Sequence, residues 1–381
     1  MNTGFWRGKR VFLTGHTGFK GSWMCLLLER LRAEVTGFSQ DPPTRPSLFQ
    51  LARIADSITS ICGDVRDLAQ LTAAVESARP DIVIHMAAQP LVRRSYRKPV
   101  ETFSTNVLGT VNVLEAIRQV GGVRAVVSVT TDKCYQNREM LWGYRENEPV
   151  GGHDPYSASK ACAELVTEAY RKSFFQAPHP QPLSPKGARG DVICSLASAR
   201  AGNVIGGGDW AEDRLIPDFI RACEGGLTIE IRSPTAIRPW QHVLEPLSGY
   251  LTLAERLHDK GVAFAEAWNF GPHDRDARPV RYIVNQLVEL WGEGAAWRLS
   301  DGDHPHEAHY LKLDCTKANS RLGWFPRTDL DTALRWIVDW HKRVRLGENA
   351  RAVSIEQIDQ FLTLEHHVQW NQPVAGFAKA S

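Results

Sequence analysis

Residues 10–31 read RVFLTGHTGFKGSWMCLLLERL. An apolar, strand-like run, Arg10–Leu13, passes through a glycine-rich turn into apolar residues at helical spacing, Ser22–Leu31. The glycines of such a turn allow a tight bend, close approach of the backbone to a pyrophosphate and close packing of helix on strand, while the helix N-terminus faces the phosphates. A glycine-rich turn alone is as often structural, but the strand before it and the helix after it favour binding. We therefore predict a dinucleotide site that includes Gly15, Thr17, Gly18, Phe19 and Gly21.

The rest of the first half alternates short β-branched runs with helical stretches. We expect strands at Arg10–Leu13, Ala33–Phe38, Ser60–Cys62, Ile82–Met86, Arg124–Val129 and Asp191–Ala199. We expect helices at Ser22–Leu31, Leu68–Ala78, Tyr96–Val120, Ser157–Phe175, Ile216–Cys223 and Val243–Leu257. Strands that alternate with helices form a parallel sheet with helices on both faces. The predicted fold class is α/β, a Rossmann-type doubly wound parallel sheet with a smaller mixed α/β domain at the C-terminal end.

The predicted division of the chain follows this pattern. Residues 1–202 form the cofactor-binding domain, and residues 240–270 return to it. Residues 203–239 and 271–350 form the substrate-binding domain, and residues 351–381 form a C-terminal tail. The stretch 176–190 holds four prolines and two glycines, so we expect an exposed loop without a chemical role.

Composition excludes several classes of function. The chain has 381 residues, 43% hydrophobic and 23% charged, with a net charge of +2, which indicates a globular protein and neither a nucleic-acid-binding nor a membrane-binding surface. The sequence has no apolar stretch of membrane-spanning length and no signal peptide. The seven cysteines form no CxxC pair. We therefore expect a protein of the reducing cytoplasm.

Five further positions extend the predicted cofactor site. Asp41 lies 20 residues after the last glycine of the turn, where a carboxylate can bind the adenosine ribose and favour NAD over NADP; a solvated turn aspartate is the alternative. Asp64, followed by Val65, could accept a hydrogen bond from the adenine amino group or cap a helix. Ala87 and Ala88 at the end of the fourth strand leave room for a cofactor, or equally for helix packing.

A second motif lies about 140 residues after the glycine turn. Tyr156 and Lys160 are spaced i, i+4, so they are neighbours on one helix face. A nearby ammonium lowers the pKa of a phenol, which can then take the proton of an alcohol as hydride leaves its carbon. Such a pair also occurs by chance, but its place in a helix after a strand ending in Thr130-Thr131 favours catalysis.

Together these segments resemble the extended short-chain dehydrogenase/reductase family. The resemblance rests on TGHTGFKG, Asp41, GDV, HMAAQ, Asn106, the Thr-rich strand end and YSASK. It implies NAD as cofactor and a homodimer or higher homo-oligomer. It also places further residues against the cofactor, namely Gln89, Asn106, Thr130, Tyr156 and Lys160.

The strand end narrows the resemblance, because Thr131 is followed by Asp132 and Lys133. In sugar-nucleotide 4,6-dehydratases this position carries an acid/base pair that removes water across C5 and C6. Many relatives have Asp-Glu here, whereas the Asp132-Lys133 version, with the segments that follow it, is similar to CDP-glucose 4,6-dehydratases. The implied catalytic residues are Thr131, Asp132, Lys133, Tyr156 and Lys160.

Segments further along the chain resemble the same family and supply candidate substrate contacts. Arg214 and Arg238 suit bidentate recognition of a diphosphate, although a single arginine is by default a solvated ion-pair partner. The remaining candidates are Gln89, Asn203, Leu215, Gln241, His309 and Tyr310. The cluster His304, His306, Glu307 and His309 contains Pro305 and matches no helical zinc motif, so we expect no metal.

The resemblance implies dehydration of CDP-D-glucose to CDP-4-keto-6-deoxy-D-glucose, in the synthesis of deoxysugars for surface polysaccharides such as the lipopolysaccharide O-antigen. NAD would take a hydride from C4 and return it to C6, so the enzyme would be a lyase. Lys133 would act as the C5 base if burial keeps it neutral, or stabilise the enolate if it stays charged. The alternatives are an NAD-dependent nucleotide-sugar 4-epimerase and, further away, a non-catalytic NAD-dependent sensor or scaffold.

Overall fold

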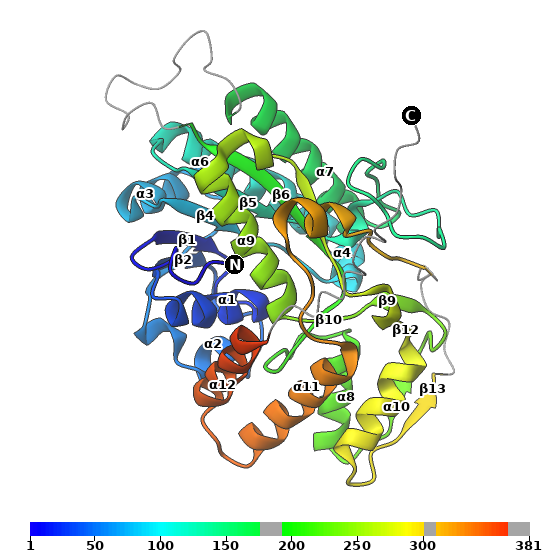
Figure 1. The fold of residues 1–381 in the computed structure, drawn as a ribbon. Coiled ribbons are helices and arrows are strands. Elements are labelled where there is room, and N and C mark those ends of the chain that lie inside the picture. The colour runs from blue at the N-terminus through cyan, green and yellow to red at the C-terminus, as the bar shows by residue number, and fades with distance from the viewer. Residues whose placement is uncertain (176–192, 301–309, 365–381) are drawn as a thin grey trace, which may run out of the picture.

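The computed structural model describes residues 1–175, 193–300 and 310–364. At its centre lies a seven-stranded sheet in the order β11-β6-β5-β4-β1-β2-β3 (Figure 1), with every neighbouring pair parallel. The strands are β1 (Arg10–Thr14), β2 (Glu34–Ser39), β3 (Thr59–Cys62), β4 (Ile82–His85), β5 (Ala125–Val129), β6 (Ser195–Ala201) and β11 (Ala267–Phe270). The strand order reverses between β1 and β4, as in doubly wound dinucleotide-binding folds. The predicted fold class is confirmed.

Helices cover both faces of the sheet (Figure 1). One face packs against α3 (Leu68–Ala78), α6 (Gly109–Val120) and α7 (Pro155–Tyr170). The other packs against α1 (Phe19–Arg30) and α9 (Leu244–Lys260), with α12 (Ala350–Thr363) against α1. Short helices fill the connections: α2 (Leu48–Leu51), α4 (Val92–Arg97) and α5 (Pro99–Phe103).

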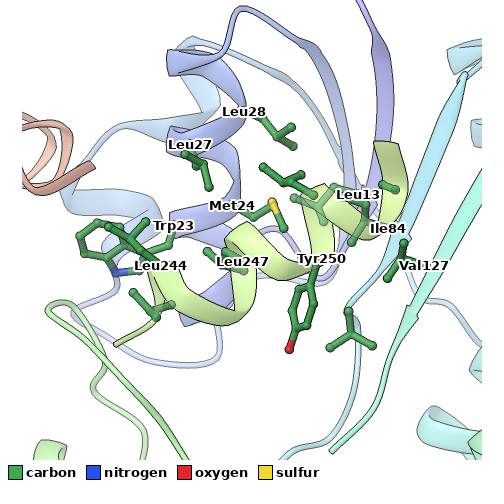
Figure 2. Close-up of a cluster of buried hydrophobic side chains, with 14 of the residues drawn as sticks. Leu13, Trp23, Met24, Leu27, Leu28, Ile84, Val127, Leu244, Leu247 and Tyr250 are labelled. Carbon is green, nitrogen blue, oxygen red and sulfur yellow. The ribbon is translucent and has the colours of Figure 1, made fainter. Parts of the chain in front are cut away.

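The apolar runs of the sequence become strands because both sheet faces are buried. Successive side chains point to opposite faces, so Leu13, Ile84 and Val127 join the core under α1 and α9 (Figure 2). Their neighbours one position earlier in each strand join the core under α3 and α6. Each fully buried Leu, Ile or Val contributes about 1.5–3 kcal/mol relative to an exposed one.

A second, smaller core lies beyond the C-terminal ends of the strands. It is formed by α8 (Leu215–Glu224), α10 (Val280–Trp291) and α11 (Leu330–Arg345). Three two-stranded sheets surround it, made from β7 (Val204–Ile205), β8 (Ile229–Ile231), β9 (Ile237–Pro239), β10 (Gln241–His242), β12 (Ala277–Pro279) and β13 (Trp297–Leu299). Between these elements the chain returns to the main sheet as α9 and β11. The domain boundaries given from the sequence stay predictions.

The single helix expected at Tyr96–Val120 is wrong. The chain there breaks at Lys98, whose ψ of 60° is not helical, and restarts at Pro99. A proline lacks the N–H that would continue the helix and restricts the residue before it. A π-helical turn, Ser104–Leu108, then leads into α6.

Candidate active site

The glycine turn between β1 and α1 is packed against the end of β4. Gly15 has φ +78°, and a Cβ there would lie 2.7 Å from the backbone nitrogen of Ala87. A Cβ on Gly21 would lie 2.1 Å from the carbonyl oxygen of Gly15. Helix α1 begins at Phe19 with Gly18 as its cap and no capping side chain. The bare first-turn amides and the lack of side chains fit a pyrophosphate.

The next loops carry the residues predicted to face the adenosine. Thr17 Oγ1 lies 2.8 Å from Ser39 Oγ and donates to the carbonyl oxygen of Gln40 at 2.9 Å. Asp41 follows β2 and is exposed. Asp64 pairs with Arg66 at 2.5 Å and accepts a hydrogen bond from Gln40, and the bond from Arg66 lowers the pKa of its carboxyl.

The alternative of Asp64 as a helix cap is wrong. Asp67 caps α3, accepting a hydrogen bond from the backbone N–H of Gln70 at 3.0 Å. Val65, next to Asp64, is buried.

The segment after β4 is held by a side-chain network. Asn106, in the π-helical turn, accepts from the backbone N–H of Gln89 at 2.8 Å and donates to Ser159 Oγ at 2.8 Å. The Gln89 amide in turn bonds Thr102 and the backbone of Leu91. Both side chains are therefore engaged within the protein, and this ties the loop of Ala87 and Ala88 to α7. Cofactor or substrate contact by Gln89 and Asn106 stays a prediction.

The turn after β5 carries the acid. Thr131 caps the 3₁₀ turn Asp132–Cys134, and its hydroxyl donates to Asp132 Oδ1 at 3.0 Å. Asp132 is 2% exposed, and its Oδ2 has no hydrogen-bond partner among the described residues. Burial raises the pKa of the Asp132 carboxyl, against the opposing effect of Lys133. A raised pKa favours the protonated form of a carboxyl, which is the form that can donate a proton.

Helix α7 brings the second motif to the same edge of the sheet. Asp154 caps its first turn, and Tyr156 and Lys160 are both buried. Lys160 Nζ donates to the carbonyl oxygen of Val129 at 3.2 Å. Burial raises the pKa of Tyr156 to about 12, although a hydrogen bond with Thr131 acts in the opposite direction.

The expected lowering of the phenol pKa by Lys160 is therefore wrong for this structure, because burial outweighs the hydrogen bond from Thr131 and the positive charge of Arg214.

Two residues of the site were assigned no role from the sequence. Lys20, in the glycine turn motif, lies with its Nζ 5.8 Å from the ring centroid of Tyr250 on α9. Burial lowers the pKa of Lys20 to about 7, and the charges of Lys160 and Arg214 add to this. The Tyr250 hydroxyl is fully buried without a partner among the described residues, and Figure 2 shows it pointing away from the leucines of α1. Only the fold brings α9 next to the turn.

The candidate substrate contacts come from the second core and its connections. Arg214 precedes Leu215, the first residue of α8, and its Nη1 donates to Asp209 at 2.9 Å. Arg238 on β9 is 6% exposed. Gln241 Nε2 donates to the carbonyl oxygen of Phe270, whereas its buried Oε1 has no partner among the described residues.

The backbone carbonyl oxygen of Asn203 accepts a hydrogen bond from the backbone N–H of Gln241. Tyr310 is half-buried, and its backbone carbonyl oxygen accepts a hydrogen bond from the side-chain amide of Asn137. The substrate role of each of these residues stays a prediction.

Several predictions fall outside the described residues: the role of His309, the metal assessment of His304–His309 and the loop at 176–190. Within residues 1–175, 193–300 and 310–364, no group of three or more His, Cys, Asp or Glu could hold a metal ion. In the same ranges, no helix is long and apolar enough to cross a membrane. All seven cysteines lie in the described part of the chain and are free thiols.

The doubly wound sheet, the glycine turn and the buried Tyr156 and Lys160 define a class of dinucleotide-dependent enzymes. Comparison with known proteins identifies the family within that class. A model of the NAD dependent epimerase/dehydratase family matches residues 11–271. The chain belongs to that family, which confirms the membership indicated by the motifs.

Particular relatives refine this assignment. The chain is 55% identical over 363 residues to a CDP-glucose 4,6-dehydratase of Salmonella typhimurium, and the match covers 95% of this chain and 99% of that protein. It is 26% identical over 345 residues to a dTDP-glucose 4,6-dehydratase of Streptomyces antibioticus, covering 87% and 92% of the two chains. Among solved structures, MoeE5 in complex with UDP-glucose and NAD is similar with a TM-score of 0.71 and 26% identity, covering 89% of this chain and 100% of that chain.

Proposed function

We propose that this chain is an NAD-dependent hydro-lyase that converts CDP-D-glucose to CDP-4-keto-6-deoxy-D-glucose. The observation that carries the proposal is Asp132, a buried carboxyl with a raised pKa beside Tyr156 and Thr131. A 4-epimerase needs the tyrosine and the threonine but no acid for a leaving hydroxyl. The 55% identity to a CDP-glucose 4,6-dehydratase over nearly the whole chain supports the same reaction.

The residues around the glycine turn fit NAD. The turn offers uncapped amides to the pyrophosphate, and Asp41, exposed after β2, is the residue that we assign to the adenosine ribose. When bound, NAD accepts a hydride from C4 of the glucose and returns it to C6. Because the cofactor is restored within one turnover, the reaction consumes no oxidant.

In the first step, Tyr156 takes the proton of the C4 hydroxyl while Thr131 hydrogen-bonds the C4 oxygen. The phenol has to be deprotonated for this, and burial alone works against it. Lys160, one helical turn away, supplies the positive charge that stabilises the phenolate once ligands exclude water.

In the second step, Asp132 protonates the departing C6 hydroxyl and the proton on C5 is removed. C5 takes up a proton again when the hydride returns to C6. Lys133 lies next to Asp132 and is half-buried. It acts either as the C5 base or as a charge that stabilises the enolate, and one experiment separates these roles. If Lys133→Ala still exchanges C5–H with solvent at the wild-type rate, Lys133 is not the base.

The nucleotide diphosphate lies between the two cores. Arg214 and Arg238 bind it, with Asn203, Gln241 and Tyr310 lining the sugar and nucleotide. Arg214 stands at the start of α8, whose N-terminus has no capping side chain, so its dipole adds to the attraction for the anionic group.

The enzyme works as a homodimer. Helices α4 and α5, the π-helical turn and α7 expose apolar side chains, among them Tyr96, Val100, Leu108 and Leu165. Exposed apolar patches of this kind mark protein interfaces. Sedimentation of wild type and of Val100→Asp tests this: the variant should sediment as a monomer, and a dimeric variant would exclude this face.

The reaction supplies a 4-keto-6-deoxy sugar for surface polysaccharides such as the O-antigen. The seven free thiols suit the reducing cytoplasm.

The test is to incubate the protein and NAD with CDP-, dTDP- and GDP-linked glucose. We expect a 4-keto product, absorbing in alkali, from CDP-glucose with no net NADH. Formation of the galactose epimer instead would establish the 4-epimerase, and binding of NAD without any turnover would establish the sensor.

A further inference from the structure

A buried carboxylate, Glu164, lies on α7 with the catalytic pair Tyr156 and Lys160 and takes no part in the mechanism above. Glu164 follows Lys160 by four residues and Tyr156 by eight, so all three project from one face of α7. Its side chain is 5% exposed. Carboxylates are almost never buried without partners. The partners of Glu164 connect it to the turn Thr131–Cys134, which we call the catalytic turn.

Glu164 is held by groups from two neighbouring strands. Ser198 Oγ donates to Oε2 at 2.7 Å and Arg200 Nη2 donates to the same oxygen at 2.8 Å, both from β6. The hydroxyl of Thr130, at the end of β5, donates to Oε1. Burial acts to raise the pKa of Glu164, but the charge of Arg200 and the hydrogen bonds from Arg200, Thr130 and Ser198 together outweigh it, and the net pKa is lowered. The carboxylate is therefore ionised in the folded protein.

The same network fixes both ends of the catalytic turn. Thr130 directly precedes Thr131. On the far side, Arg200 Nη1 donates to the hydroxyl of Tyr135 at 2.8 Å, and the guanidinium lies 4.8 Å from the centroid of that ring. The segment that carries Asp132 is thus clamped between two residues bonded to one buried ion pair.

Glu164 also faces Lys160, whose other charged and titratable neighbours come from several elements. His85 comes from β4 and Lys20 from α1. Cys134 comes from the catalytic turn. Arg200 on β6 and Arg171 after α7 face the carboxylate itself.

Burial lowers the pKa of Lys160 to about 8, and Glu164 is the largest effect in the opposite direction. Loss of the Glu164 carboxylate would leave Lys160 beside the amine of Lys20 and without the attraction of a negative charge.

We infer that Glu164 is a positioning residue for oxidation at C4: its carboxylate, together with Arg200, holds the turn Thr131–Cys134 against α7 and places a negative charge one helical turn from Lys160. The inference rests on the proposed function, because it assigns Lys160 a role in that step. A buried ion pair of this kind is weak evidence for stability alone, since desolvation offsets most of its attraction.

The test compares Glu164→Gln with Glu168→Gln, the same substitution one turn further along α7, where the side chain pairs with Lys172 near the surface. The readout is the pH dependence of kcat/KM for 4-keto product formation from CDP-glucose. We expect the alkaline limb of the Glu164→Gln profile to move to lower pH by roughly one unit or more, because a carboxylate one turn away no longer favours the ammonium. The Glu168→Gln profile should match wild type.

A wild-type profile for Glu164→Gln, or an equal shift in the control, would overturn the inference. If Glu164→Gln fails to fold because Arg200 is left uncompensated, the double variant Glu164→Gln/Arg200→Gln restores a neutral, hydrogen-bonding pair and should show the same shift. A wild-type enzyme that forms no product from CDP-glucose would instead refute the proposed function.

Discussion

Replacing Asp132 with asparagine should separate oxidation from dehydration. The asparagine has the same shape, and its Oδ1 can still accept the Thr131 hydroxyl, which lies 3.0 Å from the carboxylate oxygen in wild type. It cannot donate a proton to the departing C6 hydroxyl as an acid does. A positioned general acid contributes about 10²- to 10⁴-fold to a rate, so dehydration should fall by that factor while oxidation at C4 stays within a few-fold of wild type.

Stability should change in a defined direction with pH. The folded-state pKa of Asp132 is raised, so its contribution to stability is complete below the unfolded-state pKa and is lost as pH rises through the folded-state pKa. Asp132→Asn has no such loss. The variant should therefore unfold at a higher temperature than wild type at neutral pH, and this advantage should shrink in acid.

Two assays on one sample measure the effect. Absorbance of NADH after mixing with CDP-glucose reports oxidation at C4, and the alkali-absorbing product reports dehydration. We expect NADH to accumulate in Asp132→Asn with little 4-keto-6-deoxy product. Equal loss of both signals, or dehydration within a few-fold of wild type, would refute the role given to Asp132.

Three further substitutions test the fold around the site. Gly21→Ala should cost about 1–3 kcal/mol and weaken NAD binding in a fluorescence titration, since its Cβ would lie 2.1 Å from a carbonyl oxygen of the turn. Gly4→Ala is the control, because its Cβ would lie 3.4 Å from Asn2 Oδ1, an ordinary van der Waals contact. Tyr250→Phe removes a buried hydroxyl that has no hydrogen-bond partner among the described residues. Thermal unfolding without NAD should therefore show about 1 kcal/mol of added stability. A large loss of stability would mean that the hydroxyl is hydrogen-bonded. Leu27→Ala, in the core under α9 (Figure 2), should cost about 2–5 kcal/mol in urea unfolding, whereas Leu227→Ala, 68% exposed, should cost under about 0.5 kcal/mol.

The sequence predicted the central sheet well because its signals are local. The run 10–31 contains strand, turn and helix in one stretch, and the helix predicted at Leu68–Ala78 has the observed bounds. The break at Lys98-Pro99 was missed because apolar spacing continues across it, although the proline was a visible signal.

Electrostatics and long-range contacts were harder to predict. The spacing of Tyr156 and Lys160 reveals their proximity but not their burial, which reverses the expected shift of the phenol pKa. Tyr250 and Arg200 reach the site only because α9 and β6 pack beside it, and no local pattern marks them. Glu164 lies within the predicted helix, four residues after Lys160, as Lys160 lies four residues after Tyr156. The same i, i+4 spacing therefore places it on the face of the catalytic pair and could have been used to predict it.

The most direct test of the account follows the hydrogen on C4. CDP-glucose carrying deuterium at C4 is incubated with the protein and NAD, and the product is examined by NMR. The account predicts deuterium at C6 of the 4-keto-6-deoxy product, transferred within one molecule, and no net NADH. Deuterium that stays at C4 of a galactose epimer, or that is lost to free NADH, would contradict the account.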